Sequence, residues 1–164
     1  MSKKIIGDVD LSKLHLKELP EILKDITVGG YFYCIVNRLT SLINAPSSVG
    51  GTFDCSLNKL TTLEGSPSSV GGTFWCNGNS LTSLDGAPKS VGGHFFCGYN
   101  KLKSLAGAPS NVVGFFDCSN NLLTSLHGAP SNVGGNFYCG NNPGKFTEAQ
   151  VRAICNVKGK VYVK

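Results

Sequence analysis

Charged residues are scarce in this sequence. Asp, Glu, Lys and Arg make up 15% of the 164 residues, against about 25% in an average globular protein. No stretch approaches the ~18 apolar residues that cross a bilayer, and the start has no apolar run of signal-peptide length. We therefore expect a cytoplasmic protein that does not bind a membrane. Hydrophobic residues reach 41%, which is enough for the core of one domain.

The body of the chain also lacks clusters of like charge. The formal net charge is +5, but residues 28–142 hold only five bases and four acids, and the two ends hold the other ten bases and six acids. A protein that follows a phosphate backbone needs several bases on one face. The sequence therefore predicts no nucleic-acid partner.

Cysteine is present in an odd number, seven, which excludes a complete set of intramolecular disulfides and favours a reducing compartment. No C-x-x-C pair, typical of zinc sites, occurs. No nucleophile, base and orienting group recur together at a supporting spacing. We predict no metal, no cofactor and no catalytic residues, and we expect that the protein is not an enzyme.

Most of the sequence consists of a 21-residue repeat. The unit reads V-G-G-x-F-x-C-x-x-N-x-L-x-x-L-x-G-A-P-S-S, as in residues 49–69. Cysteines follow this step at 34, 55, 76, 97, 118 and 139, phenylalanines at 32, 53, 74, 95, 116 and 137, and asparagines at 37, 58, 79, 100, 121 and 142. Five uninterrupted copies of one unit indicate a repeat architecture.

Each unit contains one strand pattern. Phe53 and Cys55 alternate with Thr52, Asp54 and Ser56, so the first pair faces one side of the strand and the other three face the opposite side. A unit has no room for an antiparallel partner, and its remainder lacks helical periodicity. The sequence predicts a mainly β solenoid with one parallel sheet of about seven rungs, joined by extended or 3₁₀ arcs.

This pattern resembles a known family. Phe53-x-Cys55-x-x-Asn58-x-Leu60 is similar to the leucine-rich repeat pattern L-x-L-x-x-N-x-L, with Phe and Cys in the first two apolar positions. The V-G-G-x-F-x-C variant looks most like proteins of large tailed bacteriophages and some bacteria. The resemblance covers about residues 5–156 and implies a viral protein that binds a host protein on the concave side of its sheet.

The ends depart from the repeat, and we expect them to cap one domain of residues 1–164. Residues 1–27 form an N-terminal cap and degenerate rung, with a helical turn at 20–24. Residues 28–142 form six rungs of the 21-residue type, and residues 143–164 form a helix-and-strand cap. Thr147 and Gln150 are spaced as a capping box for a helix over about 147–155. Residues 160–163 read as an edge strand.

The period separates residues that the fold needs from those that it leaves free. Phe and Cys of each strand face inward, so we interpret the cysteines as small buried hydrophobes. The asparagines are expected to hydrogen-bond turn backbone inside the solenoid. The outward positions carry aromatic and acidic side chains that the core does not use. The predicted partner-binding residues are Tyr31, Tyr33, Asp54, Trp75, His94, Phe96, Phe115, Asp117 and Tyr138.

Two interpretations of these outward side chains compete. Aromatics on neighbouring strands stabilise a sheet by ~0.2–1 kcal/mol per pair. Exposed apolar surface rich in Trp and Tyr instead marks a protein interface, and this is the function that we predict. A structural virion or accessory role, and binding of a carbohydrate or small ligand, stay open as alternatives. The oligomeric state does not follow from the sequence.

Overall fold

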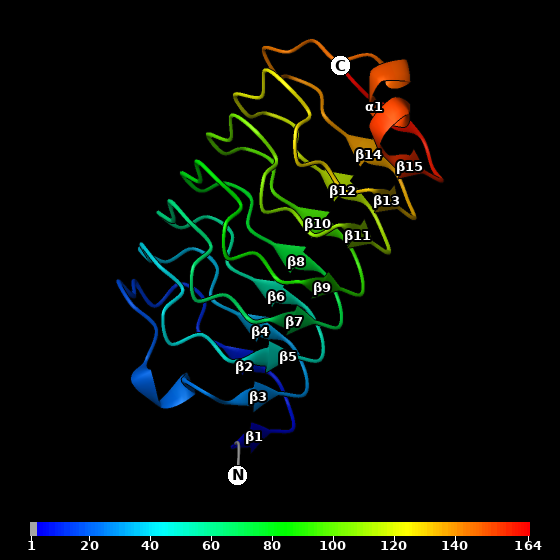
Figure 1. Cartoon of the computed structure of the whole chain (residues 1–164). Helices are drawn as coiled ribbons and strands as arrows, with labels where there is room; N and C mark the ends of the chain where they lie inside the picture. Colours follow the sequence, from blue (N-terminus) through cyan, green and yellow to red (C-terminus); the bar gives the residue numbers. More distant parts are fainter. Residues whose placement is uncertain (1–2) are drawn as a thin grey trace.

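The computed structural model describes residues 3–164 and shows a parallel β-solenoid with a period of about 21 residues. Its turns stack from the N-terminal end at the bottom of Figure 1 to the C-terminal end at the top. Every turn contributes one two-residue strand to each of two parallel sheets. The prediction of one sheet with about seven rungs is therefore wrong, because the structure has two sheets of eight strands and eight turns.

The first sheet uses the residues that precede the glycine pair of each unit. Its strands, in spatial order, are β1 (Lys4–Ile5), β3 (Thr27–Val28), β5 (Ser48–Val49), β7 (Ser69–Val70), β9 (Ser90–Val91), β11 (Asn111–Val112), β13 (Asn132–Val133) and β15 (Asn156–Val157). From β3 to β15 the valines point into the core and the Thr, Ser or Asn side chains before them point outward; in β1 the corresponding residues are Ile5 and Lys4.

The second sheet uses the residues that follow the glycine pair. Its strands are β2 (Val9–Asp10), β4 (Phe32–Tyr33), β6 (Phe53–Asp54), β8 (Phe74–Trp75), β10 (Phe95–Phe96), β12 (Phe116–Asp117), β14 (Phe137–Tyr138) and β16 (Val161–Tyr162). The glycines lie between the two sheets where neighbouring turns approach closely. A Cβ on Gly71, for example, would overlap the carbonyl oxygen of Gly50.

The core consists of columns of identical residues. The rings of Phe32 and Phe53 stack with centroids 5.3 Å apart, and this stacking continues through Phe74 and Phe95 to Phe116. The repeated leucines and cysteines beside them are buried. Burial of each such side chain contributes ~1.5–3 kcal/mol relative to exposure. The inward orientation of Phe and Cys is as the alternation predicts.

The asparagine column connects the turns through hydrogen bonds. Nδ2 of Asn79 donates to the carbonyl oxygens of Cys55, one turn back, and of Cys76, both at 3.1 Å. Oδ1 of Asn79 accepts from the backbone N–H of Leu60 at 3.0 Å. The same pattern holds from Asn58 to Asn142. These buried amides satisfy backbone groups that no strand pairs, which confirms the predicted structural role.

The ends combine predicted elements with one that the period did not indicate. The helix α1 (Glu148–Ile154) begins with the predicted capping box of Thr147 and Gln150. At the N-terminal end, the expected helical turn is the 3₁₀ helix η1 (Glu21–Leu23). The strands β15 and β16 form an eighth turn after α1, where the sequence predicted one edge strand.

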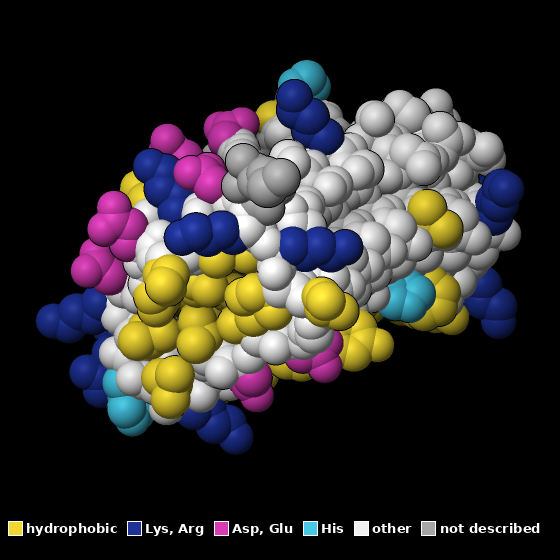
Figure 2. Space-filling model, turned by 90° about the horizontal axis from the view of Figure 1, so that it is seen from below, with side chains coloured by type: hydrophobic (Ala, Val, Ile, Leu, Met, Phe, Trp, Pro, Cys, Tyr) yellow, Lys and Arg dark blue, Asp and Glu magenta, His cyan; other side chains and the backbone are white. Residues whose placement is uncertain are grey.

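The N-terminal end of the solenoid exposes part of its core. Four inward side chains of the first described turn are only half-buried, because they pack against a neighbouring turn on one side; they are Ile5, Val9, Leu11 and Leu16. Figure 2 shows hydrophobic side chains gathered at this end of the molecule. The core of the interior turns is fully covered by comparison.

Candidate partner-binding face

All nine predicted partner-binding residues lie on the outer side of the β2–β16 sheet, and we call this set the aromatic face. It comprises Tyr31, Tyr33, Asp54, Trp75, His94, Phe96, Phe115, Asp117 and Tyr138. Tyr31 is 47% exposed, and the other eight side chains are half-buried. They are half-buried because each lies against the same position of the turns above and below it.

The rings of the aromatic face form a few stacked pairs. Trp75 stacks on Phe96 with centroids 4.0 Å apart and planes 25° apart. His94 stacks on Phe115 at 4.4 Å, and Nδ1 of His94 accepts a hydrogen bond of 2.8 Å from the backbone N–H of Phe115. Such pairs hold each ring at a fixed orientation. The face therefore presents ordered aromatic surface to a ligand.

Two aspartates interrupt the central column of rings in the same way. Asp54 lies between Tyr33 and Trp75 in strand register. Its Oδ1 accepts from the backbone N–H of Ser56 at 2.9 Å and from the Ser56 hydroxyl. Burial raises the pKa of Asp54 above its ordinary value. A carboxylate held among rings in this way carries its charge at an energetic cost.

Asp117 repeats this arrangement three turns later. It lies in register between Phe96 and Tyr138, and its Oδ1 accepts from the N–H and the hydroxyl of Ser119 at 2.8 and 2.6 Å. In the preceding turn, the position beside this carboxylate is Gly98. No side chain from that position covers Asp117.

A column of exposed side chains borders the aromatic face and was not among the predicted residues. Val36 and Leu57 have positive φ values of 55°, and Tyr99 has 54°. Their column also holds Gly78 and Asn120, which are residue types suited to this conformation. The left-handed conformation costs a residue with a Cβ roughly 1–2 kcal/mol. Val36, Leu57 and Tyr99 adopt this conformation despite its cost, and their side chains are 39%, 53% and 65% exposed.

Tyr162 extends the aromatic face into the eighth turn. Its ring stacks on that of Tyr138 with centroids 4.7 Å apart and planes 4° apart. The period did not reveal it because α1 makes the step from Tyr138 to Tyr162 24 residues rather than 21. The sequence does contain a signal for this turn. Residues 133–138 read V-G-G-N-F-Y and residues 157–162 read V-K-G-K-V-Y, so both have valine, glycine, an apolar residue and tyrosine at the same positions.

The six cysteines of the repeat lie on the opposite side of the same sheet, Cys155 directly follows α1, and all seven are buried. The Sγ–H of Cys55 donates to the carbonyl oxygen of Trp75 at 3.2 Å, one turn further on. Burial raises the pKa of Cys139 and of Cys155 to about 11, and raises those of the other five further. A protonated, buried thiol is a poor nucleophile and a poor metal ligand.

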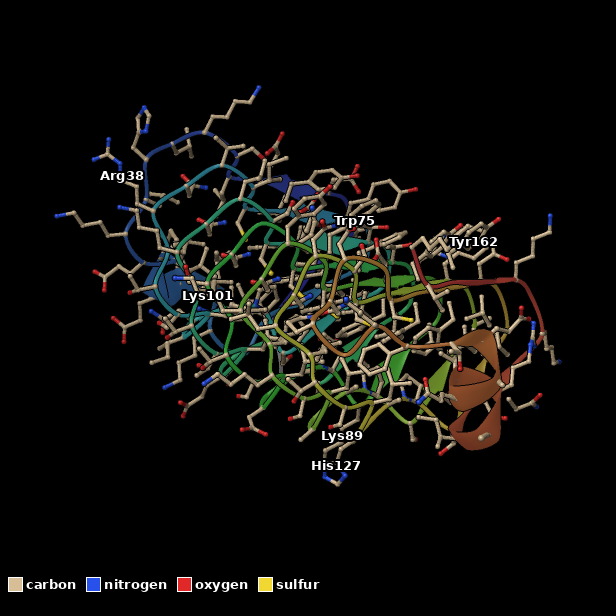
Figure 3. The ribbon with its side chains drawn as sticks, turned by 90° about the horizontal axis from the view of Figure 1, so that it is seen from above. Arg38, Trp75, Lys89, Lys101, His127 and Tyr162 are labelled. Atoms are coloured by element: carbon tan, nitrogen blue, oxygen red, sulfur yellow. The ribbon has the colours of Figure 1, made fainter. Side chains whose placement is uncertain are left out.

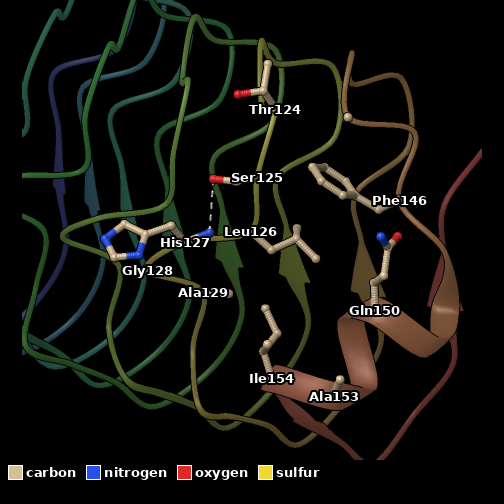
Figure 4. Close-up of a pocket in the computed structure, with 11 residues that line it drawn as sticks. Thr124, Ser125, Leu126, His127, Gly128, Ala129, Phe146, Gln150, Ala153 and Ile154 are labelled. Atoms are coloured by element: carbon tan, nitrogen blue, oxygen red, sulfur yellow. Dashed lines mark hydrogen bonds between the residues drawn. The ribbon is translucent and has the colours of Figure 1, made fainter.

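A cleft of about 640 Å³ lies on another side of the molecule, between α1 and the arc at residues 124–129 (Figure 4). Leu126 and Phe146 line it together with Ile154 of α1, and His127 lies at its edge. The lining is mostly apolar, and no charged side chain contributes to it. This cleft depends on the placement of α1 and was not predicted.

The described residues contain neither a metal-binding cluster nor a membrane-spanning helix. Among residues 3–164, no three His, Cys, Asp or Glu side chains gather closely enough to hold a metal ion. Within the same residues, no helix is long and apolar enough to cross a membrane. Comparison with protein-family models and with curated proteins gives no match.

Proposed function

We propose that this protein is a non-enzymatic interaction module that binds a partner protein on its aromatic face. The observation that carries the proposal is the Trp75–Phe96 stack on the outer side of the β2–β16 sheet. The core does not need these rings, since Phe74 and Phe95 of the same strands already fill it. Trp and Tyr dominate the energetic centres of protein interfaces.

The bordering column of exposed residues supports the same proposal. Val36, Leu57 and Tyr99 occupy a conformation that glycine or asparagine adopts at lower cost. Backbone strain of this kind concentrates at functional sites. Next to the rings of the aromatic face, these side chains add exposed apolar surface of the type found at protein contacts.

The proposal extends to the family and to the kind of partner. We assign the chain to the leucine-rich repeat type, of the variant similar to bacteriophage proteins, on the strength of the Phe, Cys, Asn and Leu columns. A viral protein of this type would meet its partner, a host protein, in the cytoplasm of an infected bacterium. Asp54 and Asp117 at the centre of the face argue against a nucleic-acid ligand, because they repel phosphate.

A carbohydrate ligand is less well supported by the ring geometry. Sugars stack on open ring faces, and the Trp75–Phe96 stack leaves only one such face on each ring. The same holds for His94 with Phe115 and for Tyr138 with Tyr162. A protein partner can also use ring edges and the apolar border.

The test is affinity capture from a bacterial lysate with the wild type and with the Trp75→Ala/Phe96→Ala double variant. A matched control replaces two exposed residues outside the aromatic face, Ile22 and Ile43, by alanine. We expect the wild type and the control to capture the same protein and the double variant to lose it. Equal capture by all three proteins would refute the proposed binding face.

A further inference from the structure

The aromatic face contains two copies of one arrangement, an aspartate in register between two aromatic residues. The first copy is Tyr33, Asp54 and Trp75, and the second is Phe96, Asp117 and Tyr138. In both copies the serine two residues after the aspartate holds one carboxylate oxygen. Three strand steps separate the two aspartates. At about 4.7–4.9 Å per step, this places them about 14–15 Å apart.

The ring stacks direct free aromatic faces toward these carboxylates. Trp75 and Phe96 stack across neighbouring strands, so the second face of Trp75 is turned toward the strand of Asp54, and that of Phe96 toward the strand of Asp117. Tyr138 stacks on Tyr162 in the same way. Its second side is therefore also turned toward the strand of Asp117. The ring of Phe115 from that turn is T-shaped to Tyr138 with centroids 6.2 Å apart, so Phe115 borders the second site.

This geometry suits a cation. Rings two strand steps apart lie about 9–10 Å apart, so a cation midway lies about 5 Å from both rings, within the ~6 Å reach of a cation–π contact. The carboxylate below supplies the opposite charge. Among residues 3–164, no hydrogen-bond donor meets the second oxygen of Asp54 or of Asp117. The only ion pair of the described residues joins Arg152 to Glu148.

In the first seven turns the protein places its own cations away from this surface, and Lys160 and Lys164 flank Tyr162 only in the eighth turn. The outward positions of the first seven turns of the β2–β16 sheet hold four aspartates, at 8, 10, 54 and 117, and no Lys or Arg. The bases of the body occupy the arcs and the other sheet. Figure 3 shows Arg38, Lys89 and Lys101 on sides of the solenoid away from Trp75. Over these seven turns, a protein of net charge +5 thus presents an acidic, aromatic surface.

From these observations we infer that the partner is basic and places two Lys or Arg side chains about 14–15 Å apart over Asp54 and Asp117. This inference rests on the proposed function and specifies the chemistry of the partner. An extended segment spans that distance with four residue steps, at ~3.3–3.6 Å per residue. A peptide with two arginines separated by three residues is therefore the simplest ligand.

The experiment uses Trp75, the only tryptophan of the chain, as a fluorescent reporter. A blocked, proline-containing peptide with two arginines separated by three residues is titrated into the protein. The first control peptide replaces both arginines by citrulline, which keeps the shape and removes the charge. The second places the two arginines side by side. We expect the first peptide to change the Trp75 emission saturably and each control to bind at least about tenfold more weakly, equal to ~1.4 kcal/mol.

Variants assign the effect to the two carboxylates. Asp54→Asn and Asp117→Asn keep the shape of the side chain, and each is expected to weaken binding of the diarginine peptide about tenfold, or ~1.4 kcal/mol. Asp85→Asn, at an exposed position of an arc, serves as the matched control and should bind like the wild type. Circular dichroism and a urea midpoint establish that each variant is folded.

The outcomes separate this inference from the proposed function. If the citrulline peptide binds as tightly as the arginine peptide, or both Asn variants bind like the wild type, the inference is overturned. A protein captured by the wild type and by both Asn variants, but not by the Trp75/Phe96 variant, would leave the interaction face in place and refute the basic partner. The peptide titration requires no captured protein, so it tests the cation sites independently.

Discussion

The indole ring of Trp75 packs on the ring of Phe96 from the next turn, with 4.0 Å between centroids, while the neighbouring residue Phe95 is fully buried on the other side of the strand. Two consecutive phenylalanines thus have different roles. We expect Phe96→Ala to lower the free energy of unfolding by about 1 kcal/mol, the scale of one cross-strand pair. Phe95→Ala should lower it by about 3–5 kcal/mol, because it leaves a cavity in the core. Urea unfolding of both variants measures the difference, and equal losses would contradict the assignment.

Asn79 and Asn77 form a second contrasting pair. Asn79 is buried and hydrogen-bonds the backbone of two turns. The Asn77 side chain has an oxygen, Oδ1, that no described donor meets. Each buried partner left unsatisfied costs ~1–3 kcal/mol, so Asn79→Ala should destabilise the protein by about 3 kcal/mol or more. Because Oδ1 of Asn77 is buried without a partner, Asn77→Ala removes an unsatisfied group and is expected not to lower the free energy of unfolding. Thermal and urea unfolding of the two variants provide the test.

The thiols predict a dependence on high pH. The pKa values of Cys139 and Cys155 are about 11 in the folded protein, against an ordinary value of 9.0. Between these values the unfolded chain releases protons that the folded chain retains, so stability falls as pH rises, by at most ~1.4 kcal/mol per pH unit for each thiol. Urea midpoints from pH 8 to 11 measure this loss.

Thiol labelling gives an independent check on the same burial. With a colorimetric thiol reagent at pH 8, all seven cysteines should react slowly in the native protein and rapidly in urea. Rapid labelling of the native protein would place the cysteines on an accessible surface and contradict the inward assignment.

Asp54 predicts an effect of the same sense at low pH, because its folded pKa is also raised. Burial raises its pKa above the ordinary 3.8, so its contribution to stability is complete below that value and is lost as pH rises through the folded pKa. Asp54→Asn removes the buried charge and should raise the free energy of unfolding at pH 7. The gain should disappear at pH 3. Asp85→Asn, measured beside it, should show neither effect.

Much of this fold follows from the 21-residue period. The period identifies the buried Phe, Cys and Leu columns, the bridging asparagines and the outward residues, because every turn repeats the same environment. The strand Ser48–Val49 escaped prediction because a strand of two residues is too short to show alternation. The eighth turn escaped because α1 changes the step to 24 residues.

The sequence predicts which residues lie on the candidate site but not how their side chains are arranged. Alternation places Trp75, Phe96 and Asp54 on one face. Which rings stack on each other, and which face each ring leaves free, depends on side-chain rotamers that packing against neighbouring turns selects. The costly backbone conformation of Leu57 was visible only indirectly, through Gly78 and Asn120 in its column. The cleft beside α1 depends on how the helix docks, and a sequence period contains no information about docking.

Because each turn contacts only the turns next to it, the distance between Asp54 and Asp117 is set by the number of repeats between them. Duplication of one 21-residue unit between β8 and β10 would move the two carboxylates to about 19 Å apart, four strand steps instead of three. Every core contact in the new protein would already exist in the present one. A single recombination event that duplicates one unit can therefore change the distance between the two carboxylates, and with it the ligand, without any new core contact.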